Sequence, residues 1–207
     1  MKEFTEDKIQ EILQGNAEGL NTEFKSSFDF AENTWMREKL IRSIFAMSNV
    51  RDGGNIVVGI KEKEDKTLDY SGVENEHLPS FNGEDLKSKV ESFSSSPVNY
   101  EIGVGTYRGK NYIVISVAEF TLNPCICRRN GEHKEKILEE GAIYVRTLKD
   151  KPSSVRLSNP VDVQDFIERV ADKQIAHQHR RGWRHESENL VIKSDKSLFE
   201  KERKGFE

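Results

Sequence analysis

Hydrophobic and polar positions within residues 18–60 predict a strand, a helix and a second strand. Residues 20–25 alternate between apolar and polar side chains, as expected of a strand buried on one face. Residues 33–50 carry a broad apolar stripe at helical spacing, and Asn33 or Thr34 is a candidate cap at the start of this helix. After a Gly-Gly turn, residues 55–60 are almost all apolar, which is typical of a strand buried on both faces. We therefore predict a β-α-β unit whose second strand lies centrally in a sheet.

Charged side chains gather on the polar side of the first of these strands. Glu23 and Lys25 are two positions apart, so their side chains point the same way along a strand, and Glu18 precedes them in the same stretch. We expect all three to project from the polar side of the β-α-β unit. The sequence leaves two interpretations of Lys25 open: contact with a phosphate group, or pairing with Glu23 or another surface carboxylate.

The remaining pattern predicts an α+β fold in which helices flank a mixed central sheet. Helical spacing predicts further helices over residues 5–14 and 83–94 and from Pro160 onward, the last with an apolar face made of Val163, Phe166, Ile167 and Val170. Period-two alternation predicts strands over residues 98–104, 112–117, 124–128 and 142–146, with a turn at 108–111 and a short hairpin around 68–73.

We divide the chain into three parts. Residues 1–157 form the main domain, residues 158–185 a helix with a basic end, and residues 186–207 a loosely packed or partner-dependent tail. The formal net charge of −4 with 33% charged residues argues against a chain that is basic throughout, but allows a local basic face.

Two features of the sequence bear on its location. There is no apolar run long enough to span a membrane, and the first residues lack the apolar core of a signal peptide, so we expect a cytoplasmic protein without membrane contact. Cys125 and Cys127 are the only cysteines. A metal site built on them would need a second pair, so we interpret them as reduced thiols on a strand.

Three short motifs follow one another in order: Glu-x-x-x-x-Glu-Phe-Lys at 18–25, Ser-x-Phe-Ala-Met-Ser-Asn at 43–49 and Gly-Gly-Asn-Ile-Val-Val-Gly-Ile at 53–60. Gly-Ala-Ile-Tyr-Val-Arg comes later, at 141–146. With this combination the chain resembles the Schlafen AlbA-like domain over residues 15–157. The resemblance implies the AlbA-like fold and nucleic-acid binding. In the Schlafen branch it further implies a metal-dependent endoribonuclease that acts on structured RNA such as tRNA.

The resemblance also implies candidate catalytic residues. Glu18 and Glu23 match the two glutamates that hold the metal ion in the Schlafen branch, and Lys25 lies beside them. The third ligand in that branch is an aspartate directly after the second strand, where this chain has Lys61. Glu62, Glu64 or Asp65 can take its place if the strand end shifts, and Glu62 is the one we name as a metal ligand. Carboxylate oxygens suit Mg²⁺ or Mn²⁺, which are therefore the cofactors expected of a nuclease here.

Cationic side chains at strand ends and near the last helix are the expected nucleic-acid contacts. Arg and Lys bind phosphate groups without reading sequence, and an aromatic ring stacks on an unpaired base. The candidates are Lys25, Arg128, Arg129, Arg146, Lys149, Lys151, Arg180, Arg181 and Trp183. Two alternatives stay open: Arg146 as the structural partner of a carboxylate in the sheet, and residues 173–184 as a solvated helix end.

Three hypotheses about function follow. The leading one is a nucleic-acid-binding protein that favours RNA, such as tRNA, over DNA, with binding that weakens steeply as salt increases. The second is a metal-dependent endoribonuclease that uses Glu18 and Glu23. The third is an oligomerisation or regulatory module in which residues 160–207 dock a partner, a homo-oligomer being one form of this.

Overall fold

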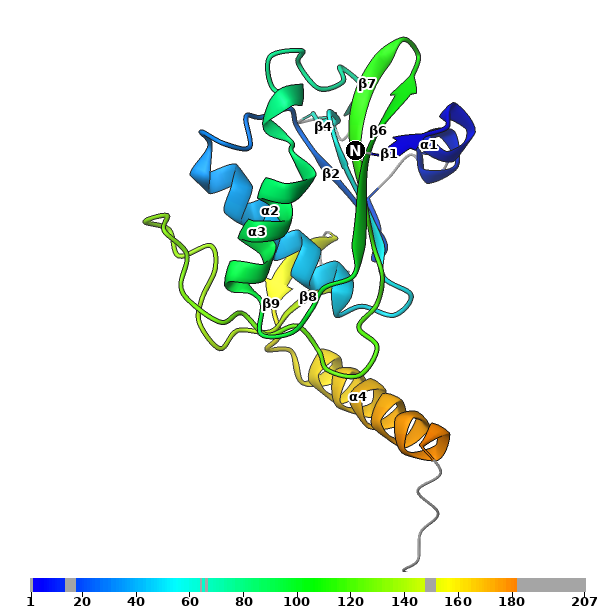
Figure 1. Cartoon of the computed structure of the whole chain (residues 1–207), viewed down its shortest axis with the longest axis vertical. Coiled ribbons are helices and arrows are strands. Elements are labelled where there is room, and N and C mark those ends of the chain that lie inside the picture. Colours follow the sequence, from blue (N-terminus) through cyan, green and yellow to red (C-terminus); the bar gives the residue numbers. More distant parts are fainter. Residues whose placement is uncertain (1, 14–17, 64, 66, 148–151, 182–207) are drawn as a thin grey trace, which may run out of the picture.

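A five-stranded mixed sheet organises the computed structural model, in the strand order β1-β6-β7-β3-β2 (Figure 1). The structure describes residues 2–13, 18–63, 65, 67–147 and 152–181. The strands are β1 (Lys2–Phe4), β2 (Thr22–Lys25), β3 (Gly54–Val58), β4 (Lys61–Glu62), β5 (Leu68–Asp69), β6 (Tyr100–Tyr107), β7 (Lys110–Val117), β8 (Tyr144–Thr147) and β9 (Ser153–Arg156). The α-helices are α1 (Glu6–Leu13), α2 (Thr34–Ser48), α3 (Gly83–Phe93) and α4 (Pro160–Arg180). The predicted α+β class is confirmed.

The β-α-β unit forms as predicted. β2 pairs with β3 in parallel and β3 pairs with β7 antiparallel, so β3 lies inside the sheet. Asn33 Oδ1 accepts a hydrogen bond from the backbone N–H of Met36 at 3.0 Å, which caps α2. After the helix, Asp52 and Gly53 adopt φ angles of 65° and 68°. A Cβ at Gly53 would lie 2.1 Å from the backbone oxygen of Val117, so this turn requires glycine.

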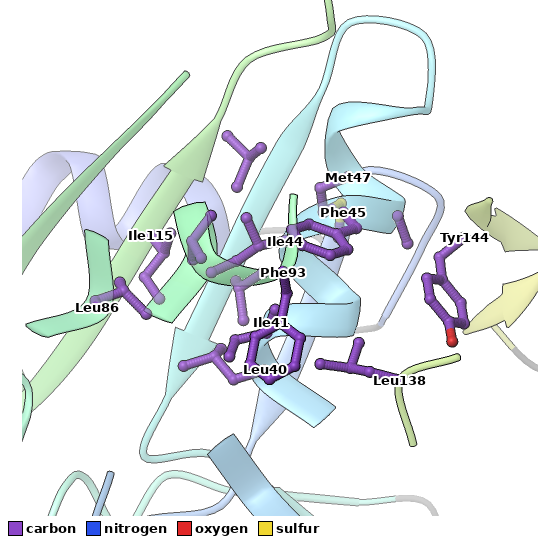
Figure 2. Packing of buried hydrophobic residues seen from close by; sticks show 14 of the residues in the cluster. Leu40, Ile41, Ile44, Phe45, Met47, Leu86, Phe93, Ile115, Leu138 and Tyr144 are labelled. Carbon is purple, nitrogen blue, oxygen red and sulfur yellow. The ribbon is translucent and has the colours of Figure 1, made fainter. Parts of the chain in front are cut away.

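The main core lies between the sheet and helices α2 and α3 (Figure 2). Leu40 and Ile44 of α2, Leu86 and Phe93 of α3 and Ile115 of β7 are all almost completely buried in it. Each such side chain contributes roughly 1.5–3 kcal/mol through burial. A smaller core forms on the opposite face of the sheet, where α1 packs. The helices predicted within 33–50 and over 83–94 therefore bury the faces that their spacing indicated.

Several strand predictions differ from the structure. The described residues 124–128 contribute isolated bridges at Ile126 and Cys127 in place of the predicted strand. The pattern does not predict β1 or β9, because runs of three or four mostly polar residues are too short to show an alternation. The turn between β6 and β7 is confined to Arg108 and Gly109, both at positive φ, which is the geometry of a two-residue hairpin.

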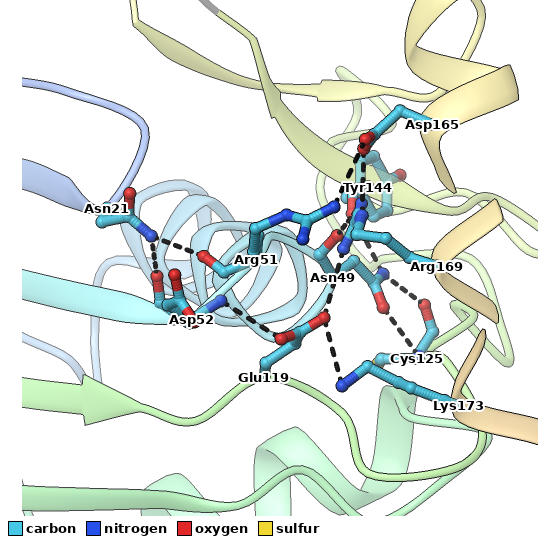
Figure 3. Close-up of polar contacts among 11 residues, drawn as sticks. Asn21, Asn49, Arg51, Asp52, Glu119, Cys125, Tyr144, Asp165, Arg169 and Lys173 are labelled. Atoms are coloured by element: carbon cyan, nitrogen blue, oxygen red, sulfur yellow. Dashed lines mark hydrogen bonds and ion pairs between the residues drawn. The ribbon is translucent and has the colours of Figure 1, made fainter. Parts of the chain in front are cut away.

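A polar network at the carboxyl end of α2 joins helix α4 to the domain (Figure 3). Arg169 is 7% exposed and donates a hydrogen bond to the backbone oxygen of Asn49 at 3.0 Å. It also pairs with Asp165 at 2.9 Å. Glu119 faces the helix and lies 3.5 Å from Arg169 and 3.3 Å from Lys173. These contacts fix the amino-terminal half of α4 against the domain.

The predicted apolar face of α4 is only partly buried. Phe166 packs against Phe120 with ring centroids 6.1 Å apart, but Ile167 is 60% exposed. The prediction that Ile167 faces the core was wrong: Phe166 packs against Phe120 of the domain, whereas Ile167, about 100° further around the helix, faces solvent. Val161 and Ile175 are also exposed on this helix. Docking of a partner on α4 stays a prediction.

The two cysteines are thiols within the core of the protein. Cys125 and Cys127 are free and buried. Burial raises the pKa of Cys125 to about 12 and that of Cys127 to about 11, so both thiols stay protonated near neutral pH.

Within the residues that the structure describes, no helix combines the length and apolar character needed to cross a membrane.

Candidate functional site

Glu23 lies at the centre of a buried polar cluster and is 5% exposed. Its Oε2 accepts hydrogen bonds from Arg146 Nη1 and Ser154 Oγ, both at 2.8 Å. Its Oε1 accepts hydrogen bonds from Ser43 Oγ at 2.8 Å and from the Lys25 ammonium. The expectation that Glu23 projects from an exposed polar side was wrong, because α2 and the paired strands β8 and β9 cover this side of β2.

Arg146, which is 4% exposed, is a structural partner in this cluster. Besides pairing with Glu23, it donates through Nη2 to the backbone oxygens of Gly19 at 2.8 Å and Thr22 at 3.0 Å. Its guanidinium therefore ties β8 to the edge strand β2. This burial overturns the interpretation of Arg146 as a nucleic-acid contact and agrees with the alternative, a partner for a carboxylate in the sheet.

Glu18 lies beside this cluster and supports the backbone of β2. Its Oε1 accepts a hydrogen bond from the backbone N–H of Phe24 at 2.9 Å. Burial raises the pKa of Glu18, an effect that the Phe24 hydrogen bond partly offsets and the nearby charge of Glu23 reinforces. Glu18 and Glu23 are therefore close, as their spacing implies, but each already has a structural partner.

The predicted metal ligands do not converge in the described part of the chain. Both oxygens of Glu23 already accept hydrogen bonds from cations and hydroxyl groups, which leaves little room for a metal ion. Glu18, Glu23 and Glu62 do not form a trio with ligand atoms within 4.8 Å of one another. The described residues that meet this distance are Glu74, Glu76 and His77. Exposed acidic groups are common on surfaces that bind no metal, so we assign none to them.

The pKa of Glu23 makes the contribution of this cluster to the stability of the fold depend on pH. Burial alone would raise this pKa, but the charges of Lys25 and Arg146 outweigh burial and hold it below its usual value. A carboxyl group with a lowered pKa in the folded state stabilises the fold above its unfolded-state pKa. That contribution is lost as the pH falls through the folded-state value. Glu18, with a raised pKa, contributes with the opposite sign.

We therefore expect the stability difference between the wild type and Glu23→Gln to depend on pH. The wild type should exceed the variant in free energy of unfolding by the largest amount near neutral pH, and the difference should shrink below pH 4.5, the usual pKa of the group. Urea unfolding at a series of pH values measures it. A difference that stays constant into strong acid would contradict the lowered pKa.

Three cations lie together next to this cluster. Lys39 and Arg42 are three residues apart on one face of α2, and Lys25 reaches this face through its contact with Glu23. Burial lowers the pKa of Lys39, and the positive charges of Lys25 and Arg42 lower it further. The buried Nε of Arg42 finds no hydrogen-bond acceptor among the described residues. We call Lys25, Lys39 and Arg42, all half-buried, the basic stripe.

Sequence reasoning identified Lys25 but missed the other two members of the basic stripe. A signal for them exists, because Trp35, Lys39 and Arg42 are spaced i, i+4 and i+7 and so share one face of α2. The Lys39 ammonium lies 3.3 Å from the centroid of the Trp35 ring. Trp35 Nε1 also donates a hydrogen bond to Glu135 at 2.9 Å. The apolar residues of α2 are more numerous, so the apolar pattern dominates the sequence of the helix and this face is easily overlooked.

The other predicted cations lie elsewhere or outside the described residues. Arg128 is exposed, and Arg129 donates to Ser92 Oγ at 3.0 Å and covers the Phe93 ring. Arg180 and Arg181 are exposed at the end of α4. The remaining candidates lie outside the described residues: Lys149, Lys151 and Trp183. Within the part of the chain that the structure describes, we find no contact between these cations and the basic stripe, so their role stays a prediction.

Comparison with known proteins identifies a family. The family model described as Schlafen, AlbA_2 matches residues 18–153 of this chain. A search of curated proteins found no match.

Two solved structures are similar to this chain at low sequence identity. The DIP2311 protein from Corynebacterium diphtheriae is 17% identical, with a TM-score of 0.43, over 72% of this chain and 26% of its own. The N-terminal domain of an ATP-dependent DNA helicase RecG-related protein from Nitrosomonas europaea is 18% identical, with a TM-score of 0.47, over 75% of this chain and 97% of its own. This chain thus spans about a quarter of the first of these proteins and nearly all of the second domain.

Proposed function

The chain belongs to the Schlafen AlbA_2 family, whose model matches well over half of it, and we propose that it binds nucleic acid through the basic stripe. The single observation that carries this proposal is the grouping of Lys25, Lys39 and Arg42. Two carboxylates act on Lys39 in the described residues, and each already has another partner: Glu23 pairs with Arg146, and Glu135 accepts a hydrogen bond from Trp35 Nε1.

Electrostatics supports this proposal. Burial lowers the pKa of Lys39 most, and repulsion from the neighbouring positive charges of Lys25 and Arg42 lowers it further. A phosphate group bound there relieves this repulsion. Phosphate contacts of this kind give affinity with little dependence on sequence.

We propose binding without cleavage as the function of this site. Support comes from Glu23, whose oxygens hold Arg146, Ser154, Ser43 and Lys25 in place of a metal ion. The Mg²⁺- or Mn²⁺-dependent endoribonuclease implied by the resemblance stays a hypothesis that no contact in the described residues supports. We also propose RNA over DNA as the ligand, because the Schlafen branch that the sequence resembles acts on structured RNA.

The double variant Lys39→Gln/Arg42→Gln tests the proposal. It removes two phosphate contacts, so we expect affinity for a labelled RNA at low salt to fall at least about 10-fold. The slope of log affinity against log salt should decrease by about two, one for each contact. Fluorescence anisotropy over a salt series, with RNA and DNA of the same sequence, measures both quantities and the preference between the two.

A matched control separates the site from overall charge. Lys87→Gln removes the same charge from the exposed surface of α3, where Lys87 has only a 3.9 Å contact with Glu91 in the described residues. This control should bind as the wild type does. Equal losses in the control and in a single Lys39→Gln variant, or an unchanged salt slope in the double variant, would reject the basic stripe as the binding site.

A further inference from the structure

A pocket of about 620 Å³ continues the basic stripe at the amino end of α2. Its walls include Ser27, Trp35, His77 and His133. Ser27 is two residues beyond Lys25 along the chain, and Trp35 is one helical turn before Lys39. The pocket and the basic stripe therefore share a boundary at which a phosphate-binding ammonium, that of Lys39, lies against an indole ring.

The side chains of this pocket suit a planar, hydrogen-bonding ligand. Trp35 and the imidazoles of His77 and His133 offer flat rings, and stacking on such rings is how proteins hold unpaired bases. His77 Nδ1 lies 2.8 Å from Ser27 Oγ, which itself accepts a hydrogen bond from the backbone N–H of Glu74 at 3.0 Å. The His77 ring is thus held in place before any ligand arrives.

Charge separates the pocket from the basic stripe. Asp29 and Glu32 also line the pocket, and Trp35 Nε1 is bonded to Glu135. Carboxylates repel phosphate but accept hydrogen bonds from the amino groups of a base. The acidic, ring-lined pocket therefore favours the base of a nucleotide, while the basic stripe favours its phosphate.

We infer that the pocket takes an unpaired base of a single-stranded nucleic acid whose backbone lies on the basic stripe. This inference rests on the proposed function, because the basic stripe must first hold the strand. In a fully paired duplex the bases are stacked inside the helix and cannot reach Trp35 without being flipped out. The site therefore selects single strands, loops and bulges over continuous duplex.

Two single-tryptophan proteins test the inference directly, since Trp35 and Trp183 are the only tryptophans of the chain. In Trp183→Phe the remaining emission comes from Trp35, and in Trp35→Phe it comes from Trp183. We expect a single-stranded oligoribonucleotide to quench the emission of Trp183→Phe at saturation and a duplex of the same sequence to leave it unchanged. Saturation is established independently by anisotropy of a labelled strand.

Affinity provides a second measurement. Trp35→Ala should weaken binding of the single strand by roughly 5- to 100-fold, as expected for loss of one base–aromatic stack, while the loss for the duplex, which reports only the contact of Trp35 with Lys39, should be much smaller. Trp35→Phe keeps a ring for stacking and should recover most of the affinity. It therefore controls for a general effect on α2, and circular dichroism checks that each variant is folded.

The outcomes separate the two proposals. If no nucleic acid binds in the anisotropy assay, the proposed function fails and the inference with it. The inference alone is overturned if binding of nucleic acid depends on Lys39 and Arg42 but Trp35 plays no part in it. In that case the emission of Trp35 does not change, and Trp35→Ala binds single strand and duplex as the wild type does. Quenching confined to Trp183 would overturn it in the same way.

Discussion

Replacing Arg146 with methionine is expected to lower the free energy of unfolding by about 3 kcal/mol. The substitution leaves the buried carboxylate of Glu23 without one of its two counter-charges and removes the Arg146 hydrogen bonds to the backbone oxygens of Gly19 and Thr22. Lys25 still contacts Glu23, which is why we expect a loss at the lower end of the range for broken buried pairs. Urea unfolding near neutral pH measures the change.

Arg156→Met is the matched control for this prediction. Arg156 lies on β9, in the strand paired with that of Arg146, but its ion pair with Glu139 is exposed, so its loss should cost less than about 1 kcal/mol. The double variant Arg146→Met/Glu23→Leu removes both charges. Its loss of stability should differ from the sum of the two single-variant losses by about 0.5–3 kcal/mol. Equal, small effects of Arg146→Met and Arg156→Met would show that the buried pair does not stabilise the fold.

This pair also changes how variants at Glu23 must be interpreted. Glu23→Ala removes the acceptor of Arg146 and Ser154 and so acts on stability before it acts on any chemistry. A loss of cleavage in such a variant would not identify Glu23 as a metal ligand. Lys39 and Arg42 carry no such structural contacts among the described side chains apart from the Trp35 ring, so their variants report on binding more directly.

Local patterns were sufficient to predict the elements with strong periodicity. The stripe of α2 and the apolar run of β3 each lie within a short stretch of chain, and the cap Asn33 precedes its helix as expected. Elements that depend on distant partners were not predictable in this way. β1 contains three residues and exists because β6, about a hundred residues later, pairs with it. Likewise, residues 124–128 form bridges and no continuous strand.

The same limit explains what was missed at the site. Alternation along β2 shows that Glu23 and Lys25 point the same way, but not that β8 and β9 cover them. Arg146, which neutralises Glu23, is 123 residues away in the chain, and no local pattern connects the two. The basic stripe, in contrast, was accessible, because the spacing of Trp35, Lys39 and Arg42 is a local helical signal.

Replacing Asn49 with alanine is expected to destabilise the protein by about 3 kcal/mol or more, because it leaves several buried backbone groups unpaired. Asn49 is completely buried, and its side-chain amide donates to the backbone oxygens of Cys125 at 2.7 Å and Tyr144 at 3.0 Å (Figure 3). Its Oδ1 accepts a hydrogen bond from the backbone N–H of Cys125 at 2.9 Å. The residue thereby joins the end of α2 to two distant segments.

Asn49→Asp distinguishes hydrogen bonding from packing. It keeps the size of the side chain and the acceptor for the Cys125 N–H, but it turns a carboxylate toward the backbone oxygens of Cys125 and Tyr144. Because a buried charge against two carbonyl groups is unfavourable, this variant should be at least as unstable as Asn49→Ala. Asn99→Ala, on the exposed surface before β6, should change stability by less than about 0.5 kcal/mol. If Asn49→Asp were as stable as the wild type, shape and not the amide donor would be what this position requires.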